Sequence, residues 1–173
     1  MLLILRSVLK PDELKPARGW LADAHFVDGK LSAGAAARRV KENEELERGA
    51  ANIERLDRLV MGALSRHPMY RNGALPLHAA SPLYARYRPG MTYGEHLDDP
   101  IMGTGGVLYR SDVAVTVFLS APEAYDGGEL VIRTAAFLSG VRETPSSAAS
   151  ARVAGARAPS GRVPLAICAR SRS

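Results

Sequence analysis

The stretch TYGEHLDDP, residues 92–100, contains the pair of residues best suited to chemistry. One residue separates His96 from Asp98, and residues i and i+2 of a strand point to the same face. An imidazole nitrogen beside a carboxylate oxygen suits a divalent first-row metal, and a second histidine would complete the two-His-one-carboxylate triad of non-haem Fe(II) oxygenases. A His-x-Asp pair alone often occurs by chance, and two polar side chains in a loop are then the simpler interpretation.

The elements that would position this pair are helices first and strands afterwards. An apolar start predicts a strand at 2–5, and helices are expected at 11–24 and 50–66. The second helix has one apolar face, made by Ile53, Leu56, Val60, Ala63 and Leu64. Alternating valines predict a strand at 111–120, and a glycine turn precedes another at 129–133. This order indicates an α+β fold with a β core behind a helical layer.

The net charge is located in one part of the chain. The sequence has 173 residues and a net charge of +5, which suits a single domain. Residues 134–173 contain six arginines, no lysine and one acidic residue, Glu143, so they carry the whole excess. The rest is neutral, and a basic face for nucleic acid is therefore not expected.

The cysteine count and the apolar runs bear on the compartment. One cysteine, Cys168, allows no internal disulfide, which fits the reducing cytoplasm. The longest apolar runs are too short for a membrane span, and the N-terminal run has no charged region before it, unlike a signal peptide. We therefore expect a cytoplasmic protein without a membrane partner.

Several further motifs surround the His-x-Asp pair in a consistent order. They are WLADAHFVDGKLSAG, VKENEEL, ARYRPGMTYGEHLDDP, RSDVAVTVFLS and YDGGELVI. Together they resemble the PKHD-type hydroxylases, bacterial Fe(II)/2-oxoglutarate dioxygenases related to prolyl 4-hydroxylases, up to about Thr134. The resemblance implies a double-stranded β-helix (jelly-roll) core with helices outside. It also implies Fe(II) held by His96 and Asp98, 2-oxoglutarate as cosubstrate, and ascorbate. Tyr87 matches an aromatic beside the 2-oxoglutarate site, although a core tyrosine fits it equally well.

The segment after Thr134 departs from the family. The family has a second histidine ligand, and then an arginine for 2-oxoglutarate, well after the GGEL turn, whereas no histidine follows His96 here. Ser150 or Ala151 stands in the histidine region, and Arg157 or Arg162 near the arginine position. Small residues and arginine dominate this segment, so we expect a dioxygenase-like domain at 1–134 with its last strands missing, and an irregular tail at 135–173. A shifted reading frame and genuine divergence both explain such a tail.

Two functions from different classes therefore stay open. The first is an Fe(II)- and 2-oxoglutarate-dependent dioxygenase (hydroxylase) family member, inactive if the absent histidine is essential. The alternative is a non-catalytic jelly-roll protein that serves binding or interaction. A nucleic-acid dealkylase with the same ligand chemistry fits less well because the body is neutral. Neither composition nor motif identifies the small-molecule or peptide substrate, or the oligomeric state.

Overall fold

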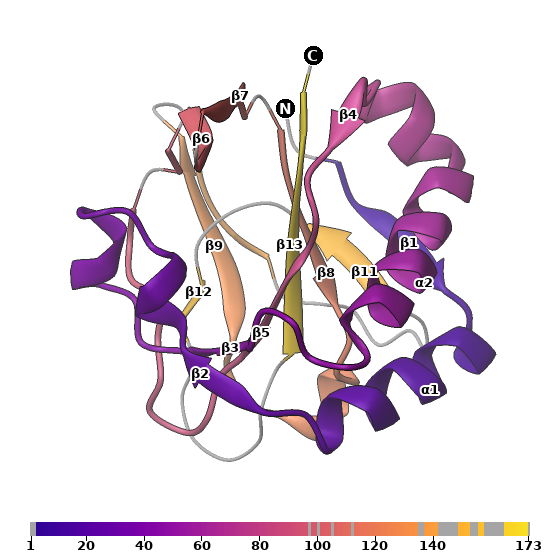
Figure 1. Cartoon of the computed structure of the whole chain (residues 1–173), viewed down its shortest axis with the longest axis horizontal. Coiled ribbons are helices and arrows are strands. Elements are labelled where there is room, and N and C mark those ends of the chain that lie inside the picture. The colour runs from indigo at the N-terminus through magenta and orange to yellow at the C-terminus, as the bar shows by residue number, and fades with distance from the viewer. Residues whose placement is uncertain are drawn as a thin grey trace.

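The computed structural model describes residues 3–96, 98–99, 101–104, 106–111, 113–134, 137–141, 149–152, 156–157 and 165–172 (Figure 1). Its two longer helices are α1 (Pro11–Ala22) and α2 (Ile53–Arg66), which confirms both predicted helices. Proline opens α1, and the Glu13 carboxylate accepts a hydrogen bond from the Lys10 backbone N–H at 3.0 Å, so the helix start is capped. Helix α2 ends at Arg66, just before Pro68, where proline disfavours further helix.

The largest sheet collects strands from the whole length of the chain. Its order is β1 (Leu5–Leu9), β11 (Ala149–Arg152), β8 (Val113–Phe118), β13 (Leu165–Arg172), β5 (Leu83–Arg86), β3 (Glu44–Leu46) and β2 (Phe26–Asp28), while β4 (His78–Ala79) also pairs with β13. All these pairings are antiparallel. Strand β1 overlaps the strand predicted at 2–5 at Leu5 and continues to Leu9, whereas β8 lies within the predicted 111–120.

Two smaller antiparallel sheets complete the described part of the fold. One has the order β10 (Phe137–Val141), β9 (Glu129–Thr134), β12 (Ala156–Arg157), and the other joins β6 (Ile101–Thr104) to β7 (Val107–Arg110). Short helical turns occupy Gly29–Ser32, Ala37–Arg39, Tyr70–Ala74 and Pro122–Ala124. Helices and antiparallel sheets together confirm the α+β class.

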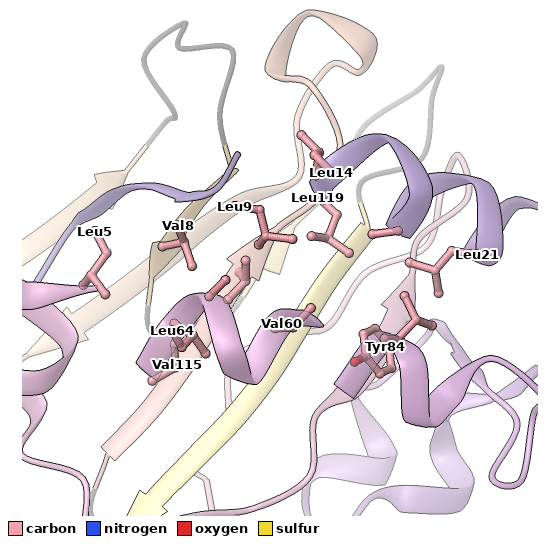
Figure 2. Packing of buried hydrophobic residues seen from close by; sticks show 14 of the residues in the cluster. Leu5, Val8, Leu9, Leu14, Leu21, Val60, Leu64, Tyr84, Val115 and Leu119 are labelled. Atoms are coloured by element: carbon pink, nitrogen blue, oxygen red, sulfur yellow. The ribbon is translucent and has the colours of Figure 1, made fainter. Parts of the chain in front are cut away.

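The hydrophobic core lies between the helices α1 and α2 and the large sheet, including its strand β1 (Figure 2). The predicted apolar face of α2 is buried there at Leu56, Val60, Ala63 and Leu64. Tyr84 of β5 is also buried, and its hydroxyl donates to the Asp57 carboxylate at 2.7 Å, which satisfies a polar group in an apolar environment. Burial raises the pKa of Tyr84 most, and the hydrogen bond to the charged Asp57 carboxylate raises it further. No helix in the part of the chain that the structure describes is long and apolar enough to cross a bilayer.

The C-terminal segment is more regular than its composition predicts. Strands β10 to β13 lie within it, and β13 occupies an inner position between β8 and β5. Regular strands thus occur in the described part of this segment, while the expectations of an irregular tail over 135–173 and of missing last jelly-roll strands stay predictions. Composition averaged over forty residues hides the apolar run at 165–168, and pairing on both sides satisfies the backbone groups of a central strand whatever its side chains. The domain boundary at residue 134 stays a prediction.

An acid-sensitive ion pair joins β3 to β5. The Glu44 carboxylate accepts from Arg86 Nε at 2.7 Å and from Arg88 Nε at 3.0 Å. Partial burial by itself would raise the pKa of Glu44, but the two arginines outweigh it and lower the pKa. A depressed folded-state pKa means that the stabilisation is present above the ordinary value, about 4.3, and is lost as the pH falls through the folded value.

We therefore expect Glu44→Gln to lower the free energy of unfolding by about 1 kcal/mol at pH 7, and by much less near pH 3. Urea unfolding of both proteins at the two pH values measures this difference. Glu42→Gln, at an exposed position two residues earlier, is the matched control and should show no such pH-dependent difference. An equal loss for Glu44→Gln at both pH values would contradict the assignment.

Candidate metal and cosubstrate site

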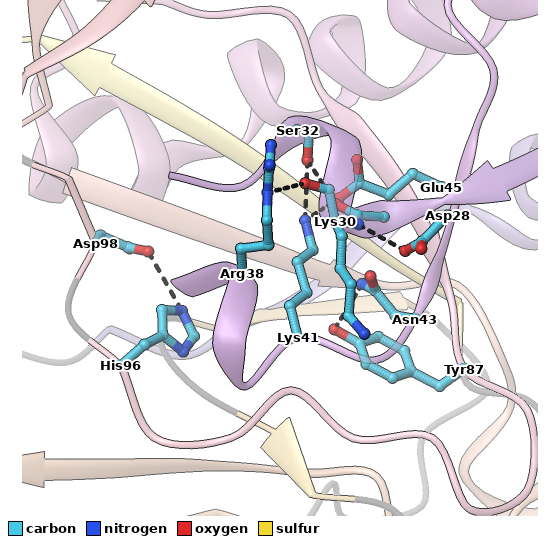
Figure 3. Close-up of polar contacts among 11 residues, drawn as sticks. Asp28, Lys30, Ser32, Arg38, Lys41, Asn43, Glu45, Tyr87, His96 and Asp98 are labelled. Atoms are coloured by element: carbon cyan, nitrogen blue, oxygen red, sulfur yellow. Dashed lines mark hydrogen bonds and ion pairs between the residues drawn. The ribbon is translucent and has the colours of Figure 1, made fainter. Parts of the chain in front are cut away.

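His96 and Asp98 converge as predicted, although they do so in a loop. His96 Nε2 and Asp98 Oδ1 are 3.6 Å apart, and the two side chains are 10% and 35% exposed (Figure 3). Neither residue is in a strand; they follow an isolated bridge between Lys41 and Tyr93 and precede β6. The expected convergence is confirmed and the expected strand position is not. Their role as metal ligands stays a prediction.

The hydrogen bond at the other ring nitrogen of His96 determines what Nε2 can do. His96 Nδ1 lies 2.7 Å from the Gly94 carbonyl oxygen. A carbonyl only accepts, so Nδ1 carries the proton, and in the neutral ring Nε2 keeps a lone pair on the side of Asp98. Histidine ligands in metal sites commonly have this arrangement. A protonated ring would instead form an ion pair with Asp98.

Residue chemistry and spacing fit two corners of a metal site. Two atoms that each lie about 2.1 Å from one ion are at most about 4.2 Å apart, so the observed 3.6 Å permits a shared ion. No group of three His, Cys, Asp or Glu side chains able to hold a metal occurs among the residues that the structure describes. His25 instead lies 3.1 Å from Glu47, and His67 contacts the Arg6 carbonyl. The fit to Fe(II) is therefore partial.

The residues proposed for the second half of the site are only partly described. Ser150 and Ala151 lie in β11, which pairs with β1 and β8. Arg157 lies in β12 beside β9, whereas Arg162 is outside the described residues. The correspondence of these residues to the second histidine and the arginine therefore stays a prediction.

A row of buried polar side chains is the feature that sequence reasoning missed. Lys41, Asn43 and Glu45, here called the polar row, alternate with more exposed Glu42 and Glu44. Lys41 Nζ lies 2.5 Å from Glu45 Oε1 and 2.9 Å from Ser32 Oγ. Burying charged groups is unfavourable unless they are paired and hydrogen-bonded. The period-2 spacing in VKENEEL was the available signal, but polar residues at that spacing usually face water.

The polar row reaches Tyr87. This tyrosine follows β5, is buried, and its hydroxyl accepts a hydrogen bond from Asn43 Nδ2 at 3.1 Å. Asn43 lies so close to Gly29 that a Cβ on that glycine would be 1.9 Å from Asn43 Oδ1. The contact therefore requires glycine at position 29. A buried, hydrogen-bonded tyrosine fits both a structural role and the expected place beside 2-oxoglutarate.

Tyr87→Phe should destabilise the protein because it leaves the buried side-chain amide of Asn43 without its hydrogen-bond acceptor. The Asn43 Oδ1 atom already makes no hydrogen bond in the part of the structure that is described, and the variant would remove the acceptor of Nδ2 as well. We expect the free energy of unfolding to fall by about 1–3 kcal/mol. Denaturant unfolding of Tyr87→Phe, Asn43→Leu and the double variant tests this as a cycle. Strictly additive losses would contradict a Tyr87–Asn43 bond of this kind.

A comparison with known proteins finds relatives that are similar to this chain in sequence. No protein-family model matches the chain. A PKHD-type hydroxylase of Thioalkalivibrio sulfidiphilus is 48% identical over 134 residues, which are 78% of this chain and 60% of the relative. A PKHD-type hydroxylase of Crocosphaera subtropica is 41% identical over 132 residues, 76% of this chain and 59% of the relative. The chain thus spans about three fifths of the length of these relatives.

Solved structures are similar in fold. A Pseudomonas putida prolyl-4-hydroxylase aligns with a TM-score of 0.59 at 16% identity, covering 99% of this chain and 91% of that one. A Trichoplax adhaerens prolyl hydroxylase, solved with a hypoxia inducible factor peptide, gives 0.59 at 17% identity, covering 98% and 82%. HygX of Streptomyces hygroscopicus, solved with nickel, 2-oxoglutarate and hygromycin B, gives 0.58 at 15% identity, covering 99% and 83%. At these identities the likeness concerns the fold alone.

Proposed function

We propose, because this chain belongs to the PKHD-type hydroxylase family, that it carries the site of an Fe(II)- and 2-oxoglutarate-dependent dioxygenase. The observation that supports this most directly is the convergence of His96 Nε2 on Asp98 Oδ1, with the Nδ1 proton of His96 directed to Gly94. A binding protein without iron chemistry would not require this arrangement. The non-catalytic alternative is therefore not favoured.

Two residues of this chain would bind the metal, and a third would orient the cosubstrate. His96 supplies a neutral nitrogen donor, and Asp98 supplies a negative oxygen that offsets part of the metal charge. When bound, Fe(II) supplies the oxidising chemistry that couples decarboxylation of 2-oxoglutarate by O₂ to hydroxylation of a substrate C–H bond, with succinate and CO₂ as the other products. Tyr87 would hydrogen-bond the cosubstrate, with Asn43 holding its oxygen in place.

Finer features follow from the family and are also proposals. We propose a double-stranded β-helix core, a requirement for ascorbate, and a small-molecule or peptide substrate, with no nucleic-acid or membrane partner. The antiparallel sheets support the first of these, and the neutral charge of residues 1–133 supports the exclusion of nucleic acid. The single cysteine supports a cytoplasmic location.

Iron binding by two protein ligands is expected to be weak, since no histidine follows His96 in the sequence. The full chain should therefore be titrated anaerobically with Fe(II) in the presence of 2-oxoglutarate, and followed by visible absorption. A metal-to-ligand charge-transfer band that disappears in Asp98→Asn would support the proposal. Absence of any band at high Fe(II) would instead support the non-catalytic alternative. Lys10→Gln, at an exposed position before α1, serves as the control.

A further inference from the structure

The aromatic ring of Tyr93 lies directly on the imidazole of His96. The two ring centroids are 3.7 Å apart and the ring planes differ by 10°. Tyr93 thereby covers one face of the candidate metal ligand. At this separation the two rings are in van der Waals contact, face to face.

A second contact to the same ring comes from the polar row. Lys41 Nζ lies over the Tyr93 ring, 5.3 Å from its centroid, within the range of a cation–π interaction. The ammonium is itself held by Glu45 and Ser32 and is buried. The ring that touches His96 is therefore supported by a charge that has little freedom to move.

Backbone pairing keeps these side chains in register. The Glu42 N–H donates to the Thr92 carbonyl and the Gly94 N–H donates to the Val40 carbonyl, both at 2.7 Å. A Cβ on Gly94 would lie 3.0 Å from the Val40 Cβ, so glycine permits this close approach. The carbonyl of the same Gly94 accepts the hydrogen bond from His96 Nδ1.

These contacts constrain the imidazole in two different ways. A histidine ring rotates about its Cβ–Cγ bond, and this torsion is only broadly restricted by the side chain itself. The Gly94 hydrogen bond fixes the position of Nδ1, and the Tyr93 stack fixes the plane of the ring. Only together do they determine the direction of Nε2, which faces Asp98.

We infer that Tyr93, supported by Lys41, is a positioning residue that holds the His96 ring in the plane needed for ligation with Asp98. This inference rests on the proposed function in one respect, namely that the ligand held is a metal ion. The ring of Tyr93, and not its hydroxyl, is the group that orients His96. Phenylalanine should therefore replace it, and an aliphatic residue should not.

The test uses the full chain and two readouts, one of which needs no metal. Tyr93→Phe keeps the ring, Tyr93→Leu removes it, and Phe26→Leu removes a ring that instead contacts Arg86. In the metal-free proteins, NMR gives the shifts of the His96 ring protons, identified by their loss in His96→Asn. Calorimetric titration with Ni(II) gives the Kd for metal.

We expect the His96 ring protons to be shifted upfield in the original chain, in Tyr93→Phe and in Phe26→Leu, and to move downfield in Tyr93→Leu. Tyr93→Leu should weaken Ni(II) binding roughly two- to tenfold, whereas Tyr93→Phe should leave it unchanged. Folding of each variant is checked by its unfolding transition.

A folded Tyr93→Leu protein with unchanged ring shifts and unchanged Ni(II) affinity would overturn the inference, as would failure of Tyr93→Phe to restore both. If the original chain binds no Ni(II), the proposed metal site fails separately. In that case the ring shifts and the proximity of His96 to Asp98 in nuclear Overhauser spectra decide whether Tyr93 orients His96. Loss of both in Tyr93→Leu, with rescue by Tyr93→Phe, would support the positioning role.

Discussion

Replacing residues 135–173 with the corresponding segment of the Thioalkalivibrio relative should raise succinate release by more than about a hundredfold. The 134 shared residues make up 60% of the relative, and the family resemblance implies that the second histidine lies after the shared part. Loss of residues that merely support a metal ligand already costs about 10- to 100-fold in metal affinity or activity. Absence of a direct ligand should cost more.

The same replacement would restore the arginine expected to bind the far carboxylate of 2-oxoglutarate. A guanidinium and a carboxylate can form two parallel hydrogen bonds. A charge-assisted contact of this kind contributes about 1.5–3 kcal/mol, or roughly ten- to a hundredfold in affinity. The apparent KM for 2-oxoglutarate should therefore fall in the chimera, independently of the gain in iron binding.

Succinate release is measured under air with Fe(II), ascorbate and 2-oxoglutarate. His96→Ala in the chimera is the control and should abolish the gained activity, because it removes a ligand on the unchanged side of the site. Equal rates for the original chain and the chimera would contradict the prediction. If the two rates are equal and both fall to background in His96→Ala, the original chain completes its metal site with a residue other than a second histidine.

Lys41→Met should lower the free energy of unfolding by about 3–5 kcal/mol. Lys41 and Glu45 are both buried, and Lys41 Nζ is 2.5 Å from Glu45 Oε1. Methionine would fill much of the space of the lysine stem but leave the Glu45 carboxylate without its counter-charge. An uncompensated buried charge is among the few changes that produce losses of this size.

Urea unfolding at pH 7 measures the loss, with Lys15→Met on the exposed face of α1 as the control. That control should change the free energy of unfolding by less than about 0.5 kcal/mol. The double variant Lys41→Met/Glu45→Leu should recover much of the stability, because it removes both charges together. If the single variant is as stable as the control, or the double variant is worse than the single one, the pair is not stabilised as argued.

Short-range patterns in the sequence were sufficient to predict the helices and the proximity of His96 to Asp98 in the candidate site. The spacing of Leu56, Val60 and Leu64 determines which face of α2 is buried, since helical geometry repeats every 3.6 residues. One intervening residue between His96 and Asp98 brings their side chains together, even in a loop. Both features depend on residues only a few positions apart, and they could therefore be predicted.

Contacts between distant segments were decided by the tertiary structure alone. Lys41 lies against Tyr93, and Asn43 reaches Tyr87, only because 40–42 pairs with 92–94 and β3 pairs with β5. Likewise β13 is an inner strand because β8 and β5 pair with its two sides, although its segment looks irregular by composition. Strand pairing depends on backbone groups that every residue carries. The residue types of two distant segments therefore do not predict that they pair.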